Sequence, residues 1–517
     1  MRRANAAEQS RASATLTVMS WTLLGKLAGV VRDTLIGAYF GAGVLGDAYA
    51  AAQAVPQAIN SLLNQGLSTV TVPYFHEDRE DAPRLNTALT RFIVAVHVPI
   101  ALFLGLAAPL YLPLVFRGLT PRGASLAADL SWLFALMLIP LDLAAVWTAR
   151  LNAERRFGRL SSANLVRSLT NVIVLVLLHR VGLISTGVAF VLGATLSLFY
   201  MWPAVHPFRR PTAQTWQRAW HAIRLMPSQI TSGVVGQINF LVDQAFASSV
   251  ATGGLIELTF GGRFLELPIS IFGSSLATVL FPDFAQHAQE QNAQGLLGAV
   301  DRALYLTWVA TLPIAFLLIG FAVPATTVVY GYGRFGHAAV LATASIVAAY
   351  AGSLIFRTMQ AFVARGFYAQ KNTSLLARTS VGFIVLNAVL DYLLIRVMGA
   401  PGIALGTTID AALYFGITTY MLEHMLLGRH VISVRPYLWS LLAALPLAPL
   451  SLAMSRLGFI HGRLMQFGLV AVGSLVLLLL YLLLLRLIGG AKGREALTMV
   501  GRVLRAPGRR WSALMRR

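Results

Sequence analysis

The residues of this sequence most able to do chemistry are charged side chains inside long apolar runs. Lys26, Arg32 and Asp33 fall in one such run, and Arg263 and Glu266 fall in another. An ionisable side chain at membrane depth is costly unless it faces a cavity or a partner, so each of these is a candidate functional group. The planar guanidinium of arginine suits phosphate because it offers two parallel hydrogen bonds. These residues therefore indicate binding of an anionic headgroup rather than covalent catalysis.

The spacing of these charges predicts which of them share a helix face. Lys26 and Asp33 share a face, whereas Arg32 points roughly 120° away unless Gly29 bends the helix. Arg263 and Glu266, at i and i+3, also share a face. If both helices line one cavity, that cavity holds three cations with a partial acidic complement. The alternative is that the charges form internal ion pairs that brace the helices.

A second set of polar residues could bind a small cation. It consists of Asp243, Asn387, Asp391, Thr407 and Asp410, each within an apolar run. Hard oxygen ligands of this kind suit an alkali cation rather than a soft metal. The same carboxylates could instead carry protons, or hydrogen-bond neighbouring helices.

Motifs typical of enzymes lack their usual context. The segments 41–46 and 331–336 fit G-x-G-x-x-G, but no strand precedes them, so we interpret them as tight turns between helices. The absence of cysteine excludes a disulfide scaffold, a thiol nucleophile and an iron–sulfur cluster. The histidines form no H-E-x-x-H pair, and no acidic D-D-x-x-D cluster is present. We therefore expect no catalytic residues and no tightly bound cofactor.

The composition predicts that these residues lie on membrane-spanning helices. Of the 517 residues, 57% are hydrophobic and 12% are charged, and the mean hydropathy is +0.69. A helix that crosses about 30 Å of hydrocarbon needs about 20 largely apolar residues. The sequence predicts an all-α polytopic membrane protein with about fourteen transmembrane helices. Their expected bounds are 15–40, 47–75, 88–112, 126–149, 161–179, 184–203, 227–250, 258–281, 303–323, 338–363, 379–395, 402–423, 436–455 and 464–485.

The basic excess predicts the orientation of these helices. With the N-terminus in the cytoplasm, most of the 41 Lys and Arg residues fall in cytoplasmic segments, so both termini are expected there. The formal charge of +21 thus indicates topology rather than a nucleic-acid partner. The basic tail at the C-terminus is typical of a helix lying on anionic membrane lipids, or of a solvated tail that only enforces topology.

A weak internal repeat predicts the domain organisation. Pro73 and Phe75 match Pro282 and Phe284, and later matches follow in the same order at a nearly constant offset. Six helices in each copy give both copies one orientation, as in transporters that bind substrate between two halves. The expected parts are an N-terminal lobe (1–203), a cytoplasmic linker (204–226), a C-terminal lobe (227–424), two added helices (425–488) and a basic tail (489–517).

Several segments together resemble a known family. They are Gly25-Lys26-Leu-Ala-Gly29-Val-Val-Arg32-Asp33, Phe40-Gly-Ala-Gly43 with Asp47-Ala48, Pro56 with Gly66, Arg263-x-x-Glu266-x-Pro268, Leu280-x-Pro282 and Tyr330-Gly-Tyr-Gly-Arg334-Phe335. Over essentially its whole length the chain resembles the MurJ (MviN) family of lipid II flippases. That family belongs to the multidrug/oligosaccharidyl-lipid/polysaccharide exporter superfamily.

The resemblance implies a function. The substrate would be lipid II, an undecaprenyl-pyrophosphate-linked disaccharide-pentapeptide of peptidoglycan synthesis. It would move from the cytoplasmic to the outer leaflet of the bacterial inner membrane by alternating access, coupled to a cation or to the membrane potential. We expect a monomer that contacts the cell-wall synthesis machinery.

The resemblance also assigns site residues. The positions implied for substrate are Lys26, Arg32, Asp33, Asp47, Asn60, Gln65, Arg263 and Glu266. The positions implied for Na⁺ as coupling ion are Asp243, Asn387, Asp391, Thr407 and the carbonyl group of Ile403.

Three positions depart from the family pattern and keep other functions open. Lys26 stands where arginine is usual, and Asn60 and Gln65 stand where Arg and Glu are usual. A paralogue that exports another polyprenyl-linked glycan, or a drug exporter of the superfamily, would fit these changes. A glycosyl- or phosphotransferase acting on the same lipid should show a large extramembrane domain or an acidic metal site. A membrane scaffold would not need intramembrane cations in both repeats.

Overall fold

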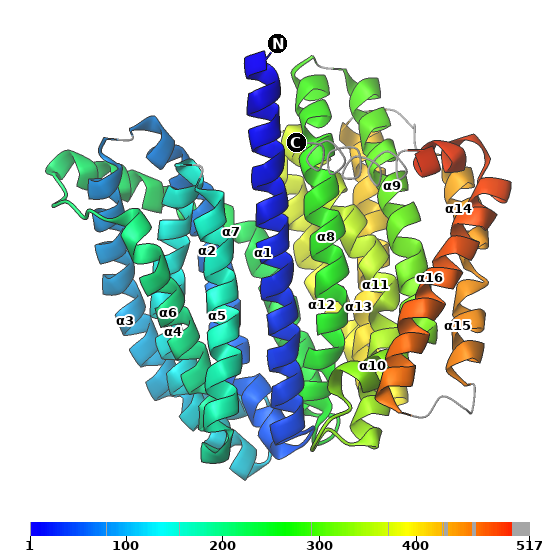
Figure 1. Cartoon of the computed structure of the whole chain (residues 1–517), viewed down its shortest axis with the longest axis horizontal. Coiled ribbons are helices and arrows are strands. Elements are labelled where there is room, and N and C mark those ends of the chain that lie inside the picture. The colour runs from blue at the N-terminus through cyan, green and yellow to red at the C-terminus, as the bar shows by residue number, and fades with distance from the viewer. Residues whose placement is uncertain are drawn as a thin grey trace. The chain divides into compact units, whose positions relative to one another are not determined.

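The computed structural model describes residues 2–498, with gaps at 79, 155, 291, 371, 427, 429–432 and 457–461 (Figure 1). In some further stretches only the backbone is described, namely 2–19, 65, 68–69, 228–232, 271, 273–283, 285, 288, 373 and 426. The described residues form helices and connecting turns, without strands. Helices satisfy their backbone polar groups internally, as a lipid environment demands. This confirms the predicted all-α fold class.

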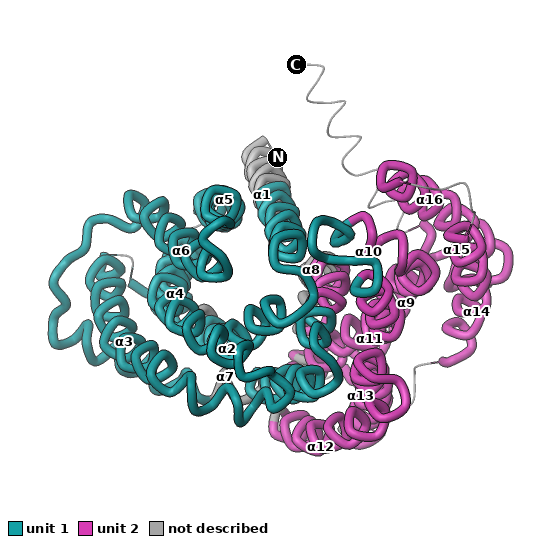
Figure 2. The backbone as a smooth tube through the Cα atoms, turned by 90° about the horizontal axis from the view of Figure 1, so that it is seen from below, with its two compact units in different colours: residues 1–259, 329–339 teal, residues 260–328, 340–517 magenta. Residues whose placement is uncertain are grey.

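The chain forms two compact units, coloured separately in Figure 2. Unit 1 comprises residues 1–259 and 329–339. Its helices are α1 (Arg2–Phe40), α2 (Val44–Glu77), α3 (Ala82–Val115), α4 (Pro121–Ala153), α5 (Phe157–Leu178), the short 3₁₀ helix η1 (His179–Val181), α6 (Ile184–Val205), α7 (Ala213–Ser248) and the start of α8 (Gly254–Gln289). Within this unit α4 packs against α2, α3 and α6, while α5 packs against α1 and α6.

Unit 2 comprises residues 260–328 and 340–517. It contains the rest of α8, then α9 (Ala293–Gly320), most of α10 (Ala322–Tyr330), α11 (His337–Ala369), α12 (Thr373–Met398), α13 (Ala400–Tyr420), the π-helical segment η2 (Met421–Leu426), α14 (Val434–Ala444), α15 (Leu447–Ser455) and α16 (Arg463–Ile488). Here α12 packs against α13, and α9 packs against α14, α15 and α16.

Ten helices within the described residues are long and apolar enough to cross a membrane. They correspond to the predicted runs 88–203 and 303–485. The other four predicted spans fall on α1, α2, α7 and α8, which are long helices of 39, 34, 36 and 36 residues. These four are more polar, or have side chains outside the described set. The chain is therefore a multi-pass membrane protein, and the number of fourteen spans stays a prediction.

Both glycine-rich segments are turns, as we interpreted them. Gly41 and Gly333 adopt φ of +72° and +54°, in the left-handed region that favours glycine. The backbone N–H of Arg334 donates to the carbonyl oxygen of Ala38 at 2.8 Å, which ties the two segments together inside unit 1. Their glycines serve backbone geometry and not a nucleotide.

The two units differ from the lobes predicted from the repeat. α7 packs against α2 and α3 and belongs to unit 1, although residues 227–248 were expected in the second lobe. The predicted linker 204–226 includes the first turns of this same helix. Grouping by contacts does not test a duplication, so the lobe boundaries stay a prediction.

Candidate functional site

The N-terminal charges of unit 1 form an ion pair on α1. Nε and Nη2 of Arg32 donate to Oδ1 of Asp33 at 2.8 and 2.6 Å. The guanidinium of Arg32 also stacks on the ring of Phe190 of α6, 4.7 Å from its centroid. Successive helical residues diverge by about 100°, but the long arginine side chain bridges this angle. Arg32 therefore contacts Asp33, although the two residues start from different directions on the helix.

A third cation of unit 1 was not assigned by the sequence. Arg167 lies on α5 within the electrostatic reach of Arg32. α1 approaches α5 closely at Gly25, where an added Cβ would lie 3.5 Å from the backbone nitrogen of Leu165. Lys26 follows directly and is half-buried. The only sequence signal for Arg167 was its position inside an apolar run.

Asp47 has a structural partner far away in the sequence. Its Oδ2 accepts from the backbone N–H of Gly253 at 2.6 Å, and its Oδ1 accepts from the N–H of Ile256 at 3.1 Å. The carboxylate thus satisfies free N–H groups at the start of α8, where negative charge is also favoured by the helix dipole. This contact accounts for a buried acid at this position without a substrate.

The neutral pair expected on α2 is described only in part. Oδ1 of Asn60 accepts from Nδ2 of Asn64 at 3.1 Å. The side chain of Gln65 lies outside the described residues. Asn60 is therefore held by a residue one turn away, which the sequence analysis did not anticipate.

Arg263 and Glu266 contact each other on α8, as their spacing predicted. Nη1 of Arg263 donates to Oε1 of Glu266 at 2.6 Å. Their side chains are 20% and 59% exposed, so the carboxylate is the more accessible member of this unit 2 pair.

Four of the five predicted cation ligands gather on α12 and α13 of unit 2. Nδ2 of Asn387 donates to Oδ2 of Asp391 at 3.2 Å, and both side chains are buried. The hydroxyl of Thr407 donates to the carbonyl oxygen of Ile403 at 3.1 Å. α13 approaches the carboxylate closely at Gly406, where an added Cβ would lie 2.6 Å from Oδ1 of Asp391. The fifth ligand, Asp243, is a buried residue of α7 in unit 1 and is described only there.

This donor set fits an alkali cation chemically. Carboxylate, amide, hydroxyl and carbonyl oxygens are hard ligands, and the glycine keeps the space beside Asp391 free of a side chain. Asp410, one turn after Gly406, is also buried. The residues present could therefore hold Na⁺.

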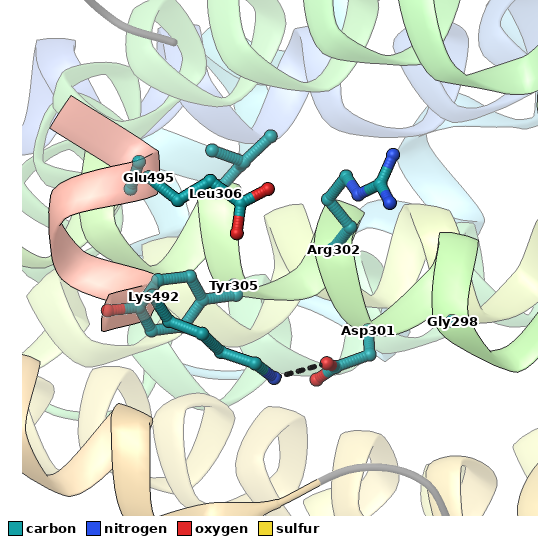
Figure 3. A pocket seen from close by; sticks show the side chains of 8 residues that line it. Gly298, Asp301, Arg302, Tyr305, Leu306, Lys492 and Glu495 are labelled. Atoms are coloured by element: carbon teal, nitrogen blue, oxygen red, sulfur yellow. Dashed lines mark hydrogen bonds and ion pairs between the residues drawn. The ribbon is translucent and has the colours of Figure 1, made fainter. Parts of the chain in front are cut away.

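A further polar cluster lies in unit 2 between α9 and residues 490–498 (Figure 3). Nζ of Lys492 lies 2.5 Å from Oδ2 of Asp301, and the hydroxyl of Tyr437 donates to Oδ1 of the same carboxylate at 3.0 Å. The pocket there also contains Arg302 and Glu495, so its charges balance and do not favour an anion. The start of the predicted basic tail is thus a helical segment paired with α9, while 499–517 lie outside the described residues.

The arrangement as a whole supports binding rather than covalent chemistry. Among the described residues no group of three or more His, Asp and Glu side chains could hold a metal ion. Arg32 pairs with Asp33, Arg263 pairs with Glu266, and Asp47 caps the start of α8. Such a site can hold an anion and exchange it as the ion pairs rearrange.

The sequence of this chain is similar to those of one known protein family. The family model described as "Lipid II flippase MurJ" matches residues 36–486. The lipid II flippase MurJ of Burkholderia cenocepacia is 22% identical over 422 residues, covering 77% of this chain and 81% of the relative. Probable lipid II flippases of Synechocystis sp. and Rhizobium meliloti are 25% and 27% identical, covering 79% and 75% of this chain and 80% and 76% of their own.

Solved structures show the same fold. A lipid II flippase MurJ in an inward closed conformation has a TM-score of 0.76 at 22% identity, covering 91% of this chain and 99% of that structure. An inward-facing multidrug resistance MATE family transporter of the MOP superfamily has a TM-score of 0.65 at 14% identity, covering 79% and 98%. Lys26, Arg32 and Asp33 precede the residues that the family model matches.

Proposed function

The chain belongs to the lipid II flippase MurJ family, and from this premise we propose that it moves lipid II across the bacterial inner membrane. Movement would run from the cytoplasmic to the outer leaflet, with both termini of the chain in the cytoplasm. The protein would work as a monomer in contact with the cell-wall synthesis machinery and with anionic membrane lipids.

The observation that carries this proposal is the cationic cluster of unit 1. Arg32 on α1 pairs with the carboxylate of Asp33 and acts electrostatically on Arg167 of α5, and Lys26 is a further cation of α1. A pyrophosphate offers several anionic oxygens, and guanidinium groups bind such oxygens in pairs. Arg263 supplies a further cation on α8, with Glu266 as a partner that a phosphate could replace.

Transport would follow from exchange of these partners. The headgroup would displace carboxylates from arginines while the polyprenyl chain remains in lipid, and the two halves of the molecule would alternate in exposing the site. A negative-inside membrane potential assists outward movement of an anionic headgroup. Na⁺ held by Asp243, Asn387, Asp391, Thr407 and the carbonyl group of Ile403 would supply a second driving force. None of these steps makes or breaks a covalent bond.

Complementation tests the proposal. A host depleted of its own lipid II flippase would express this chain, and lipid II in the outer leaflet would be measured. We expect rescue by the wild-type chain and none by Arg32→Ala or Arg263→Ala. Thr498→Ala, in the segment after α16, is the matched control and should rescue fully. Full rescue by both arginine variants would refute the cationic site, and no rescue by a correctly inserted wild-type chain would refute lipid II as substrate.

One observation favours a second candidate. Lys26, Asn60 and Gln65 replace residue types usual in the family, and Asn60 accepts a hydrogen bond from the neutral side chain of Asn64. Such a site would also suit another polyprenyl-linked glycan with the same pyrophosphate. Export of that glycan in the complementation host, without lipid II movement, would establish this alternative. A drug exporter of the superfamily would show neither.

A further inference from the structure

α3 and α4 bury a histidine and a carboxylate against each other, away from the cationic cluster. Nε2 of His97 lies 2.9 Å from Oδ2 of Asp142, and the two side chains are 1% and 0% exposed. Nδ1 of the same ring lies 2.9 Å from the carbonyl oxygen of Ile93. Neither carboxylate oxygen of Asp142 accepts a well-aligned hydrogen bond from any part of the chain that the structure describes. Nε2 of His97 is therefore the polar atom that the structure describes close to the carboxylate of Asp142.

The two ring nitrogens set the number of protons on the pair. A carbonyl oxygen can only accept, so Nδ1 of His97 must carry the proton that it donates to Ile93. In a neutral ring Nε2 is then bare, and a bare Nε2 beside a carboxylate would place two acceptors 2.9 Å apart. The contact thus needs one more proton, on Nε2 or on the carboxyl group of Asp142. Either form makes the pair neutral overall, as deep burial requires.

Other charges do not supply this neutrality. Between Tyr49 and Tyr74, α2 has no ionisable side chain, and α6 has only Tyr200. The helices packed against α3 and α4 otherwise carry Asp47, His76 and Glu77 at the ends of α2, Arg159 and Arg167 on α5, and Arg218, His221, Arg224 and Asp243 on α7. α3 and α4 themselves carry Arg84, Arg91, Tyr111, Arg122, Asp129 and Arg150. The electrostatic contact resolved for Asp142 among the described residues is with His97.

Apolar clusters enclose the pair along both helices. On one side Ile93 and Val146 belong to a buried cluster, and on the other Ala101 and Leu138 belong to a second. Water that reached the pair would have to separate these contacts. The proton is therefore held as long as α3 and α4 keep their present packing.

Both helices contain a proline beside the pair. Pro99 follows His97 by two residues, and Pro140 precedes Asp142 by two. Each proline removes one backbone hydrogen bond of its helix, and helices bend most readily at such positions. The pair thus lies where α3 and α4 are both easiest to bend.

We propose that His97 and Asp142 form a proton-binding site that couples proton movement to the conformational cycle of unit 1. Bending at Pro99 and Pro140 admits water, and the pair then transfers its proton to that water and keeps one negative charge. Repacking of α3 against α4 requires the proton to return. The site is separate from the cation ligands on α12 and α13, and the inference rests on the proposed function because lipid transport is the work to which the proton is coupled.

The first test measures proton binding without transport. Infrared difference spectra of the purified full chain between acidic and alkaline buffer contain bands from every carboxyl and imidazole group that titrates, so the spectrum of Asp142→Asn is subtracted from that of the wild type, and one band of a protonated carboxyl or imidazolium should remain. Asp142→Asn should lack this band. Thr90→Val is the matched control, because Thr90 accepts a hydrogen bond from Nε1 of Trp147 at 3.3 Å in the same interface but does not titrate. A wild type without the band, or Asp142→Asn with it unchanged, would overturn the site.

The second test measures coupling in proteoliposomes that contain lipid II. One proton moved per lipid changes the distribution of lipid II between leaflets about tenfold for each unit of pH difference. We expect this response in the wild type and in Thr90→Val, and its loss in Asp142→Asn and His97→Asn. A wild type that moves lipid II with no response to the gradient would refute the coupling. A wild type that moves no lipid II at all would refute the proposed function instead, while the infrared result would still decide whether the site binds a proton. Should Asp142→Asn fail to fold, His97→Asn tests the same pair by the same two measurements.

Discussion

Two arginine–carboxylate pairs, one in each unit, have the same chemistry but differ in how exposed their carboxylates are. Arg32 and Asp33 on α1 and Arg263 and Glu266 on α8 each approach within 2.6 Å. The carboxylate side chain is 6% exposed in the first pair and 59% exposed in the second. Breaking a buried pair leaves an uncompensated charge inside the protein, whereas breaking a more exposed pair costs less. Burial, and not the distance between the atoms, should therefore separate their contributions to stability.

The largest effect is expected for Arg32→Ala. Removal of the guanidinium leaves Asp33 without its closest cation, which should lower the free energy of unfolding by on the order of 3 kcal/mol. Denaturation in detergent would measure this loss, and Arg263→Ala provides the comparison. Equal losses for the two variants would show that burial does not distinguish the pairs.

The double variant Arg32→Ala/Asp33→Asn sharpens the comparison. An amide carries no charge, so this variant should regain most of the stability lost by Arg32→Ala, while transport stays absent because the cation is missing. Stability and outer-leaflet lipid II would be measured on the same preparations. A double variant as unstable as Arg32→Ala would mean that the guanidinium acts through packing on Phe190 and not through charge.

A smaller effect on stability is expected for Arg263→Ala and Glu266→Gln. Exposed pairs contribute about 0 to 1 kcal/mol, so both variants should unfold close to the wild type. Only Arg263→Ala should lose transport, because it alone removes a cation. A strong loss of stability in Glu266→Gln would contradict the weak contribution expected of an exposed pair.

The smallest effect is expected where α7 meets the loop after α2. Nη1 of Arg218 lies 3.1 Å from Asp78 and 3.3 Å from Asp81. The backbone N–H of Asp81 and then the Arg218 guanidinium hold the pKa of the Asp78 carboxyl below its ordinary value. This contribution is complete above the ordinary aspartate pKa and disappears as the pH falls through the lowered pKa. Arg218→Ala should mimic acid, which hydrogen exchange of residues 213–226 would show; unchanged exchange in both conditions would exclude a role in docking.

The sequence predicted the helices and the local pairing well, for physical reasons. Long apolar runs must become helices in lipid, and the i, i+3 spacing of Arg263 and Glu266 was enough to predict their contact. The helical-wheel argument considered only the direction of each side chain's origin, so it did not anticipate that the long side chain of Arg32 reaches Asp33. Residues at i and i+4 also lie on one face of a helix. This spacing accounts for the hydrogen bonds from Thr407 to Ile403 and from Asn387 to Asp391.

Contacts between distant segments could not be predicted in this way. Asp47 and Gly253 are 206 residues apart, and no local pattern marks them as partners. His97 and Asp142 lie on different helices, each as a single polar residue among apolar ones. Arg167 stood in an apolar run but acquires a neighbour only when α5 packs against α1. Such pairs depend on helix packing, which one sequence does not specify.

The contact between Asp47 and α8 has a consequence for how the protein is made. A chain that grows at about 5 to 20 residues per second takes roughly 10 to 40 seconds to synthesise the 206 residues between Asp47 and Gly253. Throughout that interval the newly inserted α2 carries an acid whose backbone donors do not yet exist. The packing of unit 1 is therefore completed only when α8 arrives, and a nascent chain that stops earlier leaves the carboxylate of Asp47 without these two donors.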